Sequence, residues 1–204
     1  DIDGGGHGYC LYIGNTTDYF IVRNCYLHNA SGDNVYLKKN TSLYLYRADN
    51  GIVENNTLSN SRYGINMDSS HHNTLSNNTV SNNYEEGMYI FNSNVNTISN
   101  NSAYDNRMGI SLSSGDDNTI VKNDASNNSL RGIDISGSDN TIKNNTASNN
   151  QDGIFMGWSE RNTIINNNIT SNDDGIKLNQ NFNNNTIINN NISNNDYGIW
   201  SYRS

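Results

Sequence analysis

Residues 139–156 read DNTIKNNTASNNQDGIFM, and this phrase decides the fold because variants of it recur along the chain. Residues 96–112, NTISNNSAYDNRMGISL, repeat the same polar and apolar positions. Each copy ends in a glycine followed by an apolar residue, and seven such pairs follow one another at spacings of 23, 22, 23, 21, 22 and 23 residues. A period in this range predicts a stacked repeat, in which each residue lies above its equivalent in the next repeat. The seven glycines are Gly64, Gly87, Gly109, Gly132, Gly153, Gly175 and Gly198.

Within each repeat the apolar residues sit in short segments that alternate with polar residues. In residues 139–156 these are Ile142, Ala147, Ile154 and Met156. Alternation with period two predicts strands, and the segments are too short for helices. Short strands separated by polar turns, repeating about every 22 residues over 204 residues, predict an all-β fold. We expect a right-handed, single-stranded parallel β-helix of about eight or nine coils, with neighbouring coils paired about 4.8 Å apart.

One asparagine recurs three residues after the first apolar position of every repeat. Asparagine tolerates positive φ in tight turns and bonds to neighbouring backbone, and stacked asparagine amides also bond to each other. We therefore predict a structural ladder along one turn of the solenoid. It comprises Asn56, Asn78, Asn101, Asn123, Asn145, Asn167 and Asn190. The glycines that precede the inward apolar residues are expected to be corners with φ above zero.

The repeat predicts one β-helix domain over residues 1–204. Regular repeats cover residues 49–204, whereas residues 1–48 form irregular N-terminal coils with an extra loop near residues 29–41. Only 33% of the residues are hydrophobic, which would suit a disordered chain, but their fixed positions favour stacked coils. The chain begins without Met and neither end shows a polar cap. We expect either a piece of a longer β-helix or subunits that stack through open strand edges.

The charge distribution excludes some classes of partner. The formal net charge is −8, and the 12 Lys and Arg residues are scattered along the chain, with only Lys38 and Lys39 adjacent. Without a basic stripe to neutralise phosphates, we expect no nucleic acid partner. No run approaches 18 apolar residues, so no transmembrane segment is predicted. Cys10 and Cys25 leave two alternatives open, a disulfide or two free thiols.

The phrases at residues 96–112 and 139–156 resemble the repeats of the NosD-like family, within the pectate-lyase-like superfamily of right-handed parallel β-helices. The resemblance covers nearly the whole chain, most clearly residues 49–202. It implies the fold, but it does not single out one function. Members of the family include proteins of copper-site maturation in the periplasm, archaeal surface proteins and polysaccharide lyases. The asparagine-rich style resembles the surface proteins of methanogenic archaea in particular, which implies an extracellular or cell-surface location. Fold alone does not give function.

The strand after each glycine directs aromatic side chains outward, near both ends of the expected rod. Exposed aromatic rings can stack on sugars or contact a protein, although aromatic residues also simply suit strands. We interpret them as interaction residues and favour a protein contact over a sugar. They are Tyr44, Tyr46, Tyr89, Phe91, Phe155, Trp158, Trp200 and Tyr202.

Four aspartates, Asp152, Asp173, Asp174 and Asp196, precede the glycines of the last repeats. Asp152 and Asp174 are expected to stack one coil apart, about 5 Å from each other. Carboxylates that close raise each other's pKa or recruit a cation, and oxygen-rich clusters suit Ca²⁺. A calcium site is therefore one hypothesis, and a solvated acidic corner is the favoured alternative.

Catalytic and copper chemistry find less support. Asp134 and Lys177 share a column but lie two coils apart, and no complete set of convergent carboxylates or lyase groups is evident. If the chain were an enzyme, a polysaccharide lyase or a glycoside hydrolase would be expected. Copper binding is not expected, because the methionines at 67, 88 and 156 face inward and the adjacent His71 and His72 would point to opposite faces of a strand.

Eleven Asn-x-Ser/Thr sequons occur in the chain. They would permit glycosylation of a secreted protein, although an asparagine-rich repeat also produces them automatically. The candidates singled out are Asn15, Asn29, Asn40, Asn77, Asn127, Asn168 and Asn191.

Together these features favour an extracellular structural protein, a sheath, fibre or surface-layer component that assembles by head-to-tail or side-by-side stacking of its own copies. This interpretation requires no cofactor. The alternative is a β-helix domain that binds or cleaves a polysaccharide on the outward face of the strands after the glycines.

Overall fold

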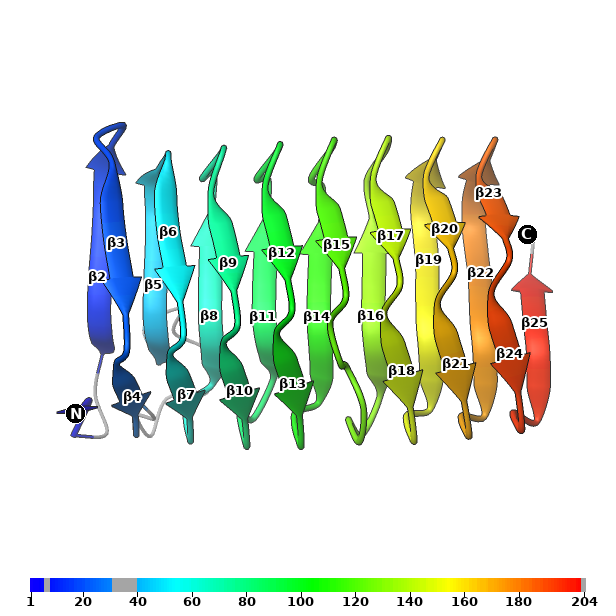
Figure 1. Cartoon of the computed structure of the whole chain (residues 1–204), viewed down its shortest axis with the longest axis horizontal. Helices are drawn as coiled ribbons and strands as arrows, with labels where there is room; N and C mark the ends of the chain where they lie inside the picture. The colour runs from blue at the N-terminus through cyan, green and yellow to red at the C-terminus, as the bar shows by residue number, and fades with distance from the viewer. Residues whose placement is uncertain (6–7, 31–39, 203–204) are drawn as a thin grey trace.

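The computed structural model describes residues 1–5, 8–30 and 40–202, and it shows a rod of stacked coils (Figure 1). Within these ranges the chain forms strands and turns without helices, which confirms the predicted all-β solenoid. No helix long and apolar enough to cross a membrane occurs in the part of the chain so described. The loop expected near residues 29–41 falls mainly on residues 31–39, which lie outside the described residues.

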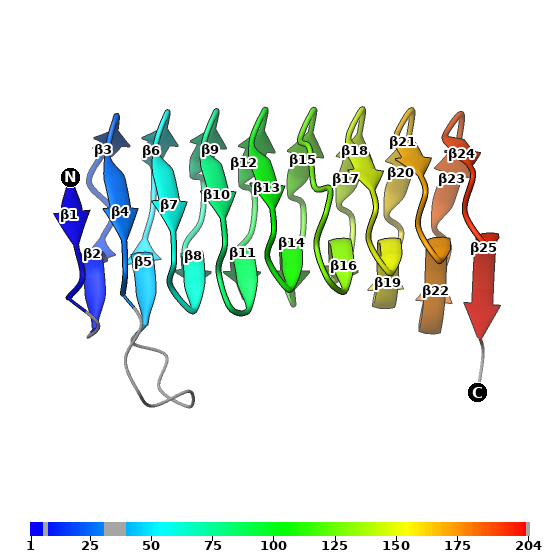
Figure 2. The same cartoon turned by 90° about the horizontal axis from the view of Figure 1, so that it is seen from below.

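The coils contribute strands to three faces, and every pair of neighbouring strands is parallel (Figures 1 and 2). The nine-stranded sheet contains β2 (Tyr9–Thr16), β5 (Thr41–Ala48), β8 (Tyr63–Asp68), β11 (Glu86–Phe91), β14 (Met108–Ser113), β16 (Arg131–Ser136), β19 (Asp152–Glu160), β22 (Asp174–Asn183) and β25 (Tyr197–Tyr202). The eight-stranded sheet contains β3 (Phe20–Arg23), β6 (Gly51–Glu54), β9 (Thr74–Ser76), β12 (Thr97–Ser99), β15 (Thr119–Val121), β17 (Thr141–Lys143), β20 (Thr163–Ile165) and β23 (Thr186–Ile188).

The third face consists of two shorter sheets. Five strands form the first, β1 (Ile2–Asp3), β4 (Tyr26–His28), β7 (Thr57–Ser59), β10 (Thr79–Ser81) and β13 (Ser102–Tyr104). Three form the second, β18 (Thr146–Ser148), β21 (Asn168–Thr170) and β24 (Asn191–Ser193). Asp124 joins the two sheets through single bridges to Ser102 and Thr146.

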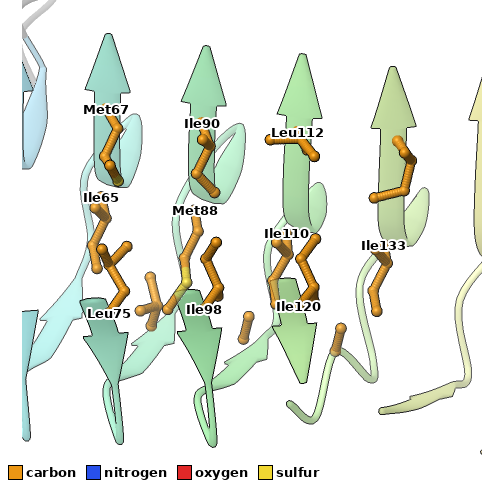
Figure 3. Close-up of a cluster of buried hydrophobic side chains, with 14 of the residues drawn as sticks. Ile65, Met67, Leu75, Met88, Ile90, Ile98, Ile110, Leu112, Ile120 and Ile133 are labelled. Carbon is orange, nitrogen blue, oxygen red and sulfur yellow. The ribbon is translucent and has the colours of Figure 1, made fainter. Parts of the chain in front are cut away.

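The register aligns equivalent residues of successive repeats. Ile110 pairs with Met88 on one side and with Ile133 on the other, and all three are fully buried. Figure 3 shows these side chains pointing into the interior between the sheets. Because each apolar residue packs against its equivalents above and below, a narrow shaft forms a continuous core from few hydrophobic residues.

Three asparagine ladders run along the rod. In the predicted ladder, Asn56 to Asn190, each Nδ2 donates to the Oδ1 of the next member at 2.9 to 3.1 Å. The other two ladders were not predicted from the sequence. The second ladder comprises Asn73, Asn96, Asn118, Asn140, Asn162 and Asn185. The third comprises Asn83, Asn106, Asn128, Asn150, Asn172 and Asn195.

Two expectations about backbone conformation need correction. The positive φ falls on the residue before the ladder asparagine, such as Asn77 (φ 55°) before Asn78, so the turn and the ladder use different side chains. Gly87 does not have positive φ either. A Cβ atom there would lie 2.8 Å from the carbonyl oxygen of Gly109 and 2.9 Å from Asn106 Nδ2. Glycine is needed at this position because the third ladder and the next coil approach so closely.

Candidate functional site

The outer face of the nine-stranded sheet contains most of the aromatic residues that the sequence singled out. Residues at equivalent positions of successive coils form columns along this face. One column runs through Tyr44, Asn66, Tyr89, Ser111, Asp134, Phe155, Lys177 and Trp200. Its composition changes along the rod from aromatic to charged, so the two halves of the face differ chemically.

At the N-terminal end of the face, Tyr9, Tyr12, Tyr44 and Tyr46 line a cleft of about 440 Å³. The ring centroids of Tyr9 and Tyr44 are 5.0 Å apart, and Tyr12 lies 5.7 Å from both. Tyr12 is 45% exposed, whereas Tyr44 is only 8% exposed. Tyr44 therefore forms part of the floor of the cleft and Tyr12 an accessible wall.

Two neighbouring residues hold the rings of this tyrosine cleft in place. Tyr44 Oη donates to Asp68 Oδ2 at 3.4 Å. Burial, and next the charge of Asp68, raise the pKa of Tyr44 well above its ordinary value, so its hydroxyl stays neutral. Gly14 leaves room for the Tyr12 ring, because a Cβ atom on Gly14 would collide with Tyr12 Oη.

The centre of the face is a packed layer around Glu86. Tyr63 stacks on Tyr89 at 5.7 Å, and Tyr89 stacks on Phe91 at 6.1 Å. Glu86 is 8% exposed. Burial, with a smaller contribution from the charge of Glu85, raises the pKa of Glu86 to about 7. The Glu86 carboxyl is therefore partly protonated at neutral pH.

The C-terminal half of the face carries a row of alternating charges. Arg131 Nη1 lies 2.7 Å from Asp134, and its Nε lies 3.4 Å from Asp152. Lys177 Nζ continues the row, 3.1 Å from Asp152 and 2.8 Å from Asp174. Burial raises the pKa of Asp134 although Arg131 opposes this. Burial alone would lower the pKa of Lys177, but its hydrogen bonds to Asp174 and Asp152 more than offset this and raise it.

This row corrects two sequence-based expectations. Arg131 Cζ lies 3.4 Å from the centre of the Phe155 ring, which leaves Phe155 only 8% exposed rather than available for contact. Asp152 and Asp174 are register partners, as expected. However, Lys177 bridges their carboxylates, so its ammonium group provides the positive charge for which the sequence suggested a calcium ion.

The rest of the proposed calcium cluster does not converge either. Asp173 and Asp196 are exposed, whereas Asp152 and Asp174 are buried. In the described part of the chain, no group of three His, Cys, Asp or Glu residues is placed to hold a metal ion.

The other predicted aromatic residues lie in separate places. Tyr44 and Tyr46 are neighbours in the cleft, with centroids 6.2 Å apart. Trp200 and Tyr202 stack at 6.0 Å on β25, at the opposite end of the sheet. Trp158, with φ 53° and 64% exposed, lies within β19 where the register with β22 shifts. They form several patches rather than one surface.

Tyr9 and Tyr12 were not predicted as site residues from the sequence. Tyr12 pairs with Tyr44, although 32 residues separate them instead of about 22. The longer N-terminal repeat thus breaks the spacing that aligned the other columns. The signal that could have found these residues is the similarity of the YCLYIG and TSLYLY segments at residues 9–14 and 41–46.

The glycosylation candidates divide by exposure. Asn40 is only 6% exposed, so the folded chain cannot present it to a glycosylating enzyme. Asn29 is half-buried. The exposed candidates are Asn15 near the end of β2, Asn77 and Asn127 in turns, and Asn168 and Asn191 at the starts of β21 and β24.

With the geometry established, comparison with known proteins identifies the family. The family model described as "Periplasmic copper-binding protein (NosD)" matches residues 7–131 and 107–204, which together span nearly the whole chain. The chain belongs to the NosD family. No curated protein sequence matches this NosD-family chain closely enough to count as a relative.

Several solved structures share the fold. The periplasmic alginate epimerase AlgG aligns with a TM-score of 0.82 at 19% identity over 91% of this chain and 48% of its own. The A-module of the Azotobacter vinelandii mannuronan C-5 epimerase AlgE6 gives 0.73 at 18% identity, over 89% and 53%. Pectate lyase Pel9A gives 0.56 at 16% identity, over 93% and 69%. These likenesses establish a right-handed parallel β-helix, and the chain spans about half the length of the epimerases.

The described residues do not fit the copper ion in the family's description. Met67, Met88 and Met156 are fully buried among apolar side chains (Figure 3 labels the first two). His71 Nδ1 accepts a hydrogen bond from the Asn94 backbone at 3.0 Å and is thus already engaged. Copper sites need several soft or imidazole ligands converging on one point, so we derive no chemistry through this metal.

Proposed function

We propose that this NosD-family chain binds a neutral polysaccharide on the outer face of its nine-stranded sheet, with the tyrosine cleft as the main contact. The observation that carries the proposal is the half-exposed ring of Tyr12 beside Tyr9 and Tyr44 in a cleft of about 440 Å³. Aromatic rings stack on the apolar faces of sugars, and phenol hydroxyls bond to sugar hydroxyls. The epimerase and lyase structures that share the fold act on polysaccharides by their names, which supports this class of ligand.

The charges favour a neutral polymer over alginate or pectate. A polyanion needs cations that are free to bind it, but Arg131 and Lys177, in the C-terminal half of the face, each contact two carboxylates of the chain. Beside the cleft, Arg47 lies over the Tyr46 ring, 5.1 Å from its centroid. The chain as a whole carries a formal charge of −8 and would repel a uronate polymer. Hydroxyl-rich neutral sugars avoid this repulsion.

We propose binding rather than cleavage. The half-buried Asp134 carboxyl is held by Arg131 at 2.7 Å, so it is not free to act as a general acid or base. Glu86 is also buried, at 8% exposed, within the packed tyrosine layer. By analogy with the periplasmic proteins that it resembles, we place the chain in the cell envelope or outside the cell.

Titration calorimetry with soluble glucan, mannan, alginate and polygalacturonate tests the proposal. We expect binding of a neutral polymer and a loss of about tenfold in affinity for Tyr12→Ala, since one aromatic contact is worth up to about 1.5 kcal/mol. Tyr19→Ala removes a tyrosine that is 62% exposed and lies outside the cleft, and it should bind normally. Binding only to the acidic polymers, or no effect of Tyr12→Ala, would overturn the proposal.

Self-assembly, the role that the sequence favours, is the second candidate, and it rests on Trp200 and the exposed Tyr202 of β25. Electron microscopy of the same purified protein distinguishes the two. Filaments that disappear when both residues are changed to alanine would support assembly. Uniform particles that bind glucan or mannan would support saccharide binding.

A further inference from the structure

A second hollow, separate from the tyrosine cleft, lies along the corner between the third face and the nine-stranded sheet. It is a shallow hollow, largely open to solvent, with a volume of about 940 Å³, and it follows four successive coils. Its walls are the turns before β11, β14, β16 and β19, which lie next to one another along the rod (Figure 2). We call it the corner groove.

Unequal turn lengths explain why a groove forms here. The turn before β11 spans four residues, 82–85, whereas the turn before β14 spans three, 105–107. The number of residues from the third-ladder asparagine to the glycine alternates in the same way, four from Asn83 to Gly87 and three from Asn106 to Gly109. The next coil is long again, with four from Asn128 to Gly132. Two longer turns therefore flank a shorter one and leave a notch at Arg107.

The groove is rigid because each turn is bonded to the next. Tyr84 N donates to Ser61 O, Arg107 N to Glu85 O and Ser129 N to Asn106 O, each at 2.9 Å. Beneath the turns lies the third ladder, whose asparagines in these coils, Asn83, Asn106, Asn128 and Asn150, are buried. A preformed groove loses little conformational entropy when it takes up a ligand.

The exposed lining is aromatic at one wall and polar elsewhere. Tyr84 is 69% exposed. Arg107 Nη1 contacts Glu85 at 3.1 Å, and the Arg107 side chain is 47% exposed. A guanidinium has five donors, so several remain for a ligand. Further along, the exposed amides of Asn127 and Asn149 are joined by one hydrogen bond of 3.2 Å, which leaves them additional donors and acceptors.

We propose that the corner groove is a second saccharide-binding site, which holds a neutral sugar chain lying parallel to the rod axis. Polar groups repeat along the groove at the coil spacing of about 4.8 Å, so an extended polymer of hydroxyl-bearing units can contact each coil in turn. Tyr84 stacks on one sugar ring, and Arg107, Asn127 and Asn149 bond to hydroxyls. Glu85 and Asp105 set two carboxylates against the single guanidinium, which disfavours an anionic ligand.

The groove and the tyrosine cleft lie in different places on the coil, so one molecule would contact two polymer chains or two stretches of one chain. Such a pair of sites binds a long polymer more tightly than either site binds a short oligosaccharide. The inference does not require the tyrosine cleft to bind sugar.

NMR of the ¹⁵N-labelled chain, titrated with cellohexaose and mannohexaose, tests the groove directly. We expect shifts at the amides of Tyr84, Arg107 and Ser129, and a loss of about tenfold in groove affinity for Tyr84→Ala. Tyr19→Ala is the matched control and should leave both sites unchanged.

The two proposals fail differently. Shifts around Tyr12 and Tyr44 without shifts in the groove would overturn the second site and leave the proposed function standing. Shifts in the groove that Tyr84→Ala removes, with none near Tyr12, would establish the groove and refute the tyrosine cleft. No shift at either place refutes both.

Discussion

Replacing Asn101 by alanine tests how strongly the asparagine ladder stabilises the rod. The Asn101 side chain is 2% exposed and reaches three coils. Its Nδ2 donates to Leu75 O at 2.9 Å and to Asn123 Oδ1 at 3.0 Å. Its Oδ1 accepts from Asn78 N at 2.9 Å and from Asn78 Nδ2 at 3.0 Å. The substitution removes all four bonds.

At a net value of about 1 kcal/mol for each hydrogen bond, the free energy of unfolding should fall by about 4 kcal/mol. Two corrections to this sum oppose each other. Asn78 Nδ2 keeps its bond to Val53 O, which reduces the loss, whereas the Asn78 backbone N–H is left buried without a partner, which increases it. Asn77→Gly is the matched control. Asn77 is exposed, with φ 55°, a conformation that glycine adopts without strain, so this change should be nearly neutral.

Urea unfolding followed by circular dichroism measures the loss, and hydrogen exchange locates it. The Asn78 amide proton should exchange orders of magnitude faster in Asn101→Ala, since about 4 kcal/mol corresponds to roughly a thousandfold change in an equilibrium constant. If the variant lost less than about 1 kcal/mol and the Asn78 amide stayed protected, the ladder would not be a stabilising element, and the reasoning would be refuted.

Three further substitutions extend the test. Gly87→Ala forces a Cβ atom against the backbone of the next coil and should lower the free energy of unfolding in urea by about 1–3 kcal/mol. In the control Gly198→Ala the nearest atom to the new Cβ would be 3.8 Å away, so the loss should be small. Equal losses for the two variants would contradict the steric explanation. Because the folded pKa of Glu86, about 7, exceeds its ordinary value of 4.5, the folded state holds a proton that the unfolded state releases. Stability should therefore fall as pH rises from about 4.5 to 7, by roughly 3 kcal/mol, and Glu86→Gln should abolish this decline; an unchanged pH profile would count against the shift. Lys177→Met removes one of the cations that contact Asp152, whose side chain is only 3% exposed. The free energy of unfolding should fall by about 3 kcal/mol in the same urea assay. An unchanged stability would show that the charged row is dispensable.

The fold follows from the repeat period, because one spacing fixes every register. Once Ile65, Met88 and Ile110 are recognised as equivalents, parallel pairing and a shared core follow without further assumption. The second and third ladders carry the same period, but period alone does not separate the two members of an Asn-Asn pair. Asn77 has the left-handed backbone and faces solvent, whereas Asn78 is buried, and only the backbone geometry distinguishes them.

The candidate site is harder to predict from the sequence than the fold. Alternation places Phe155 on the outer face, but it cannot show that Arg131 from the preceding coil covers the ring. Nor can it show that Lys177 reaches both Asp152 and Asp174, because that contact depends on side-chain conformation. The corner groove depends on a single extra residue in two turns. This signal is present in the uneven spacing of the glycines, but only the structure shows which corner the extra residue occupies.

The ladders also give the rod an electrical direction. In each ladder, the side-chain amide nitrogen of one coil points to the side-chain amide oxygen of the next coil toward the C-terminus, as from Asn78 to Asn101 and from Asn83 to Asn106. These aligned dipoles polarise one another and add along the axis. A coil grafted beyond the C-terminal side would have to offer an oxygen, and one grafted before the N-terminal side a nitrogen. Engineered lengthening of this rod should therefore succeed when the added coil carries asparagine at the three ladder positions, and fail when leucine replaces them.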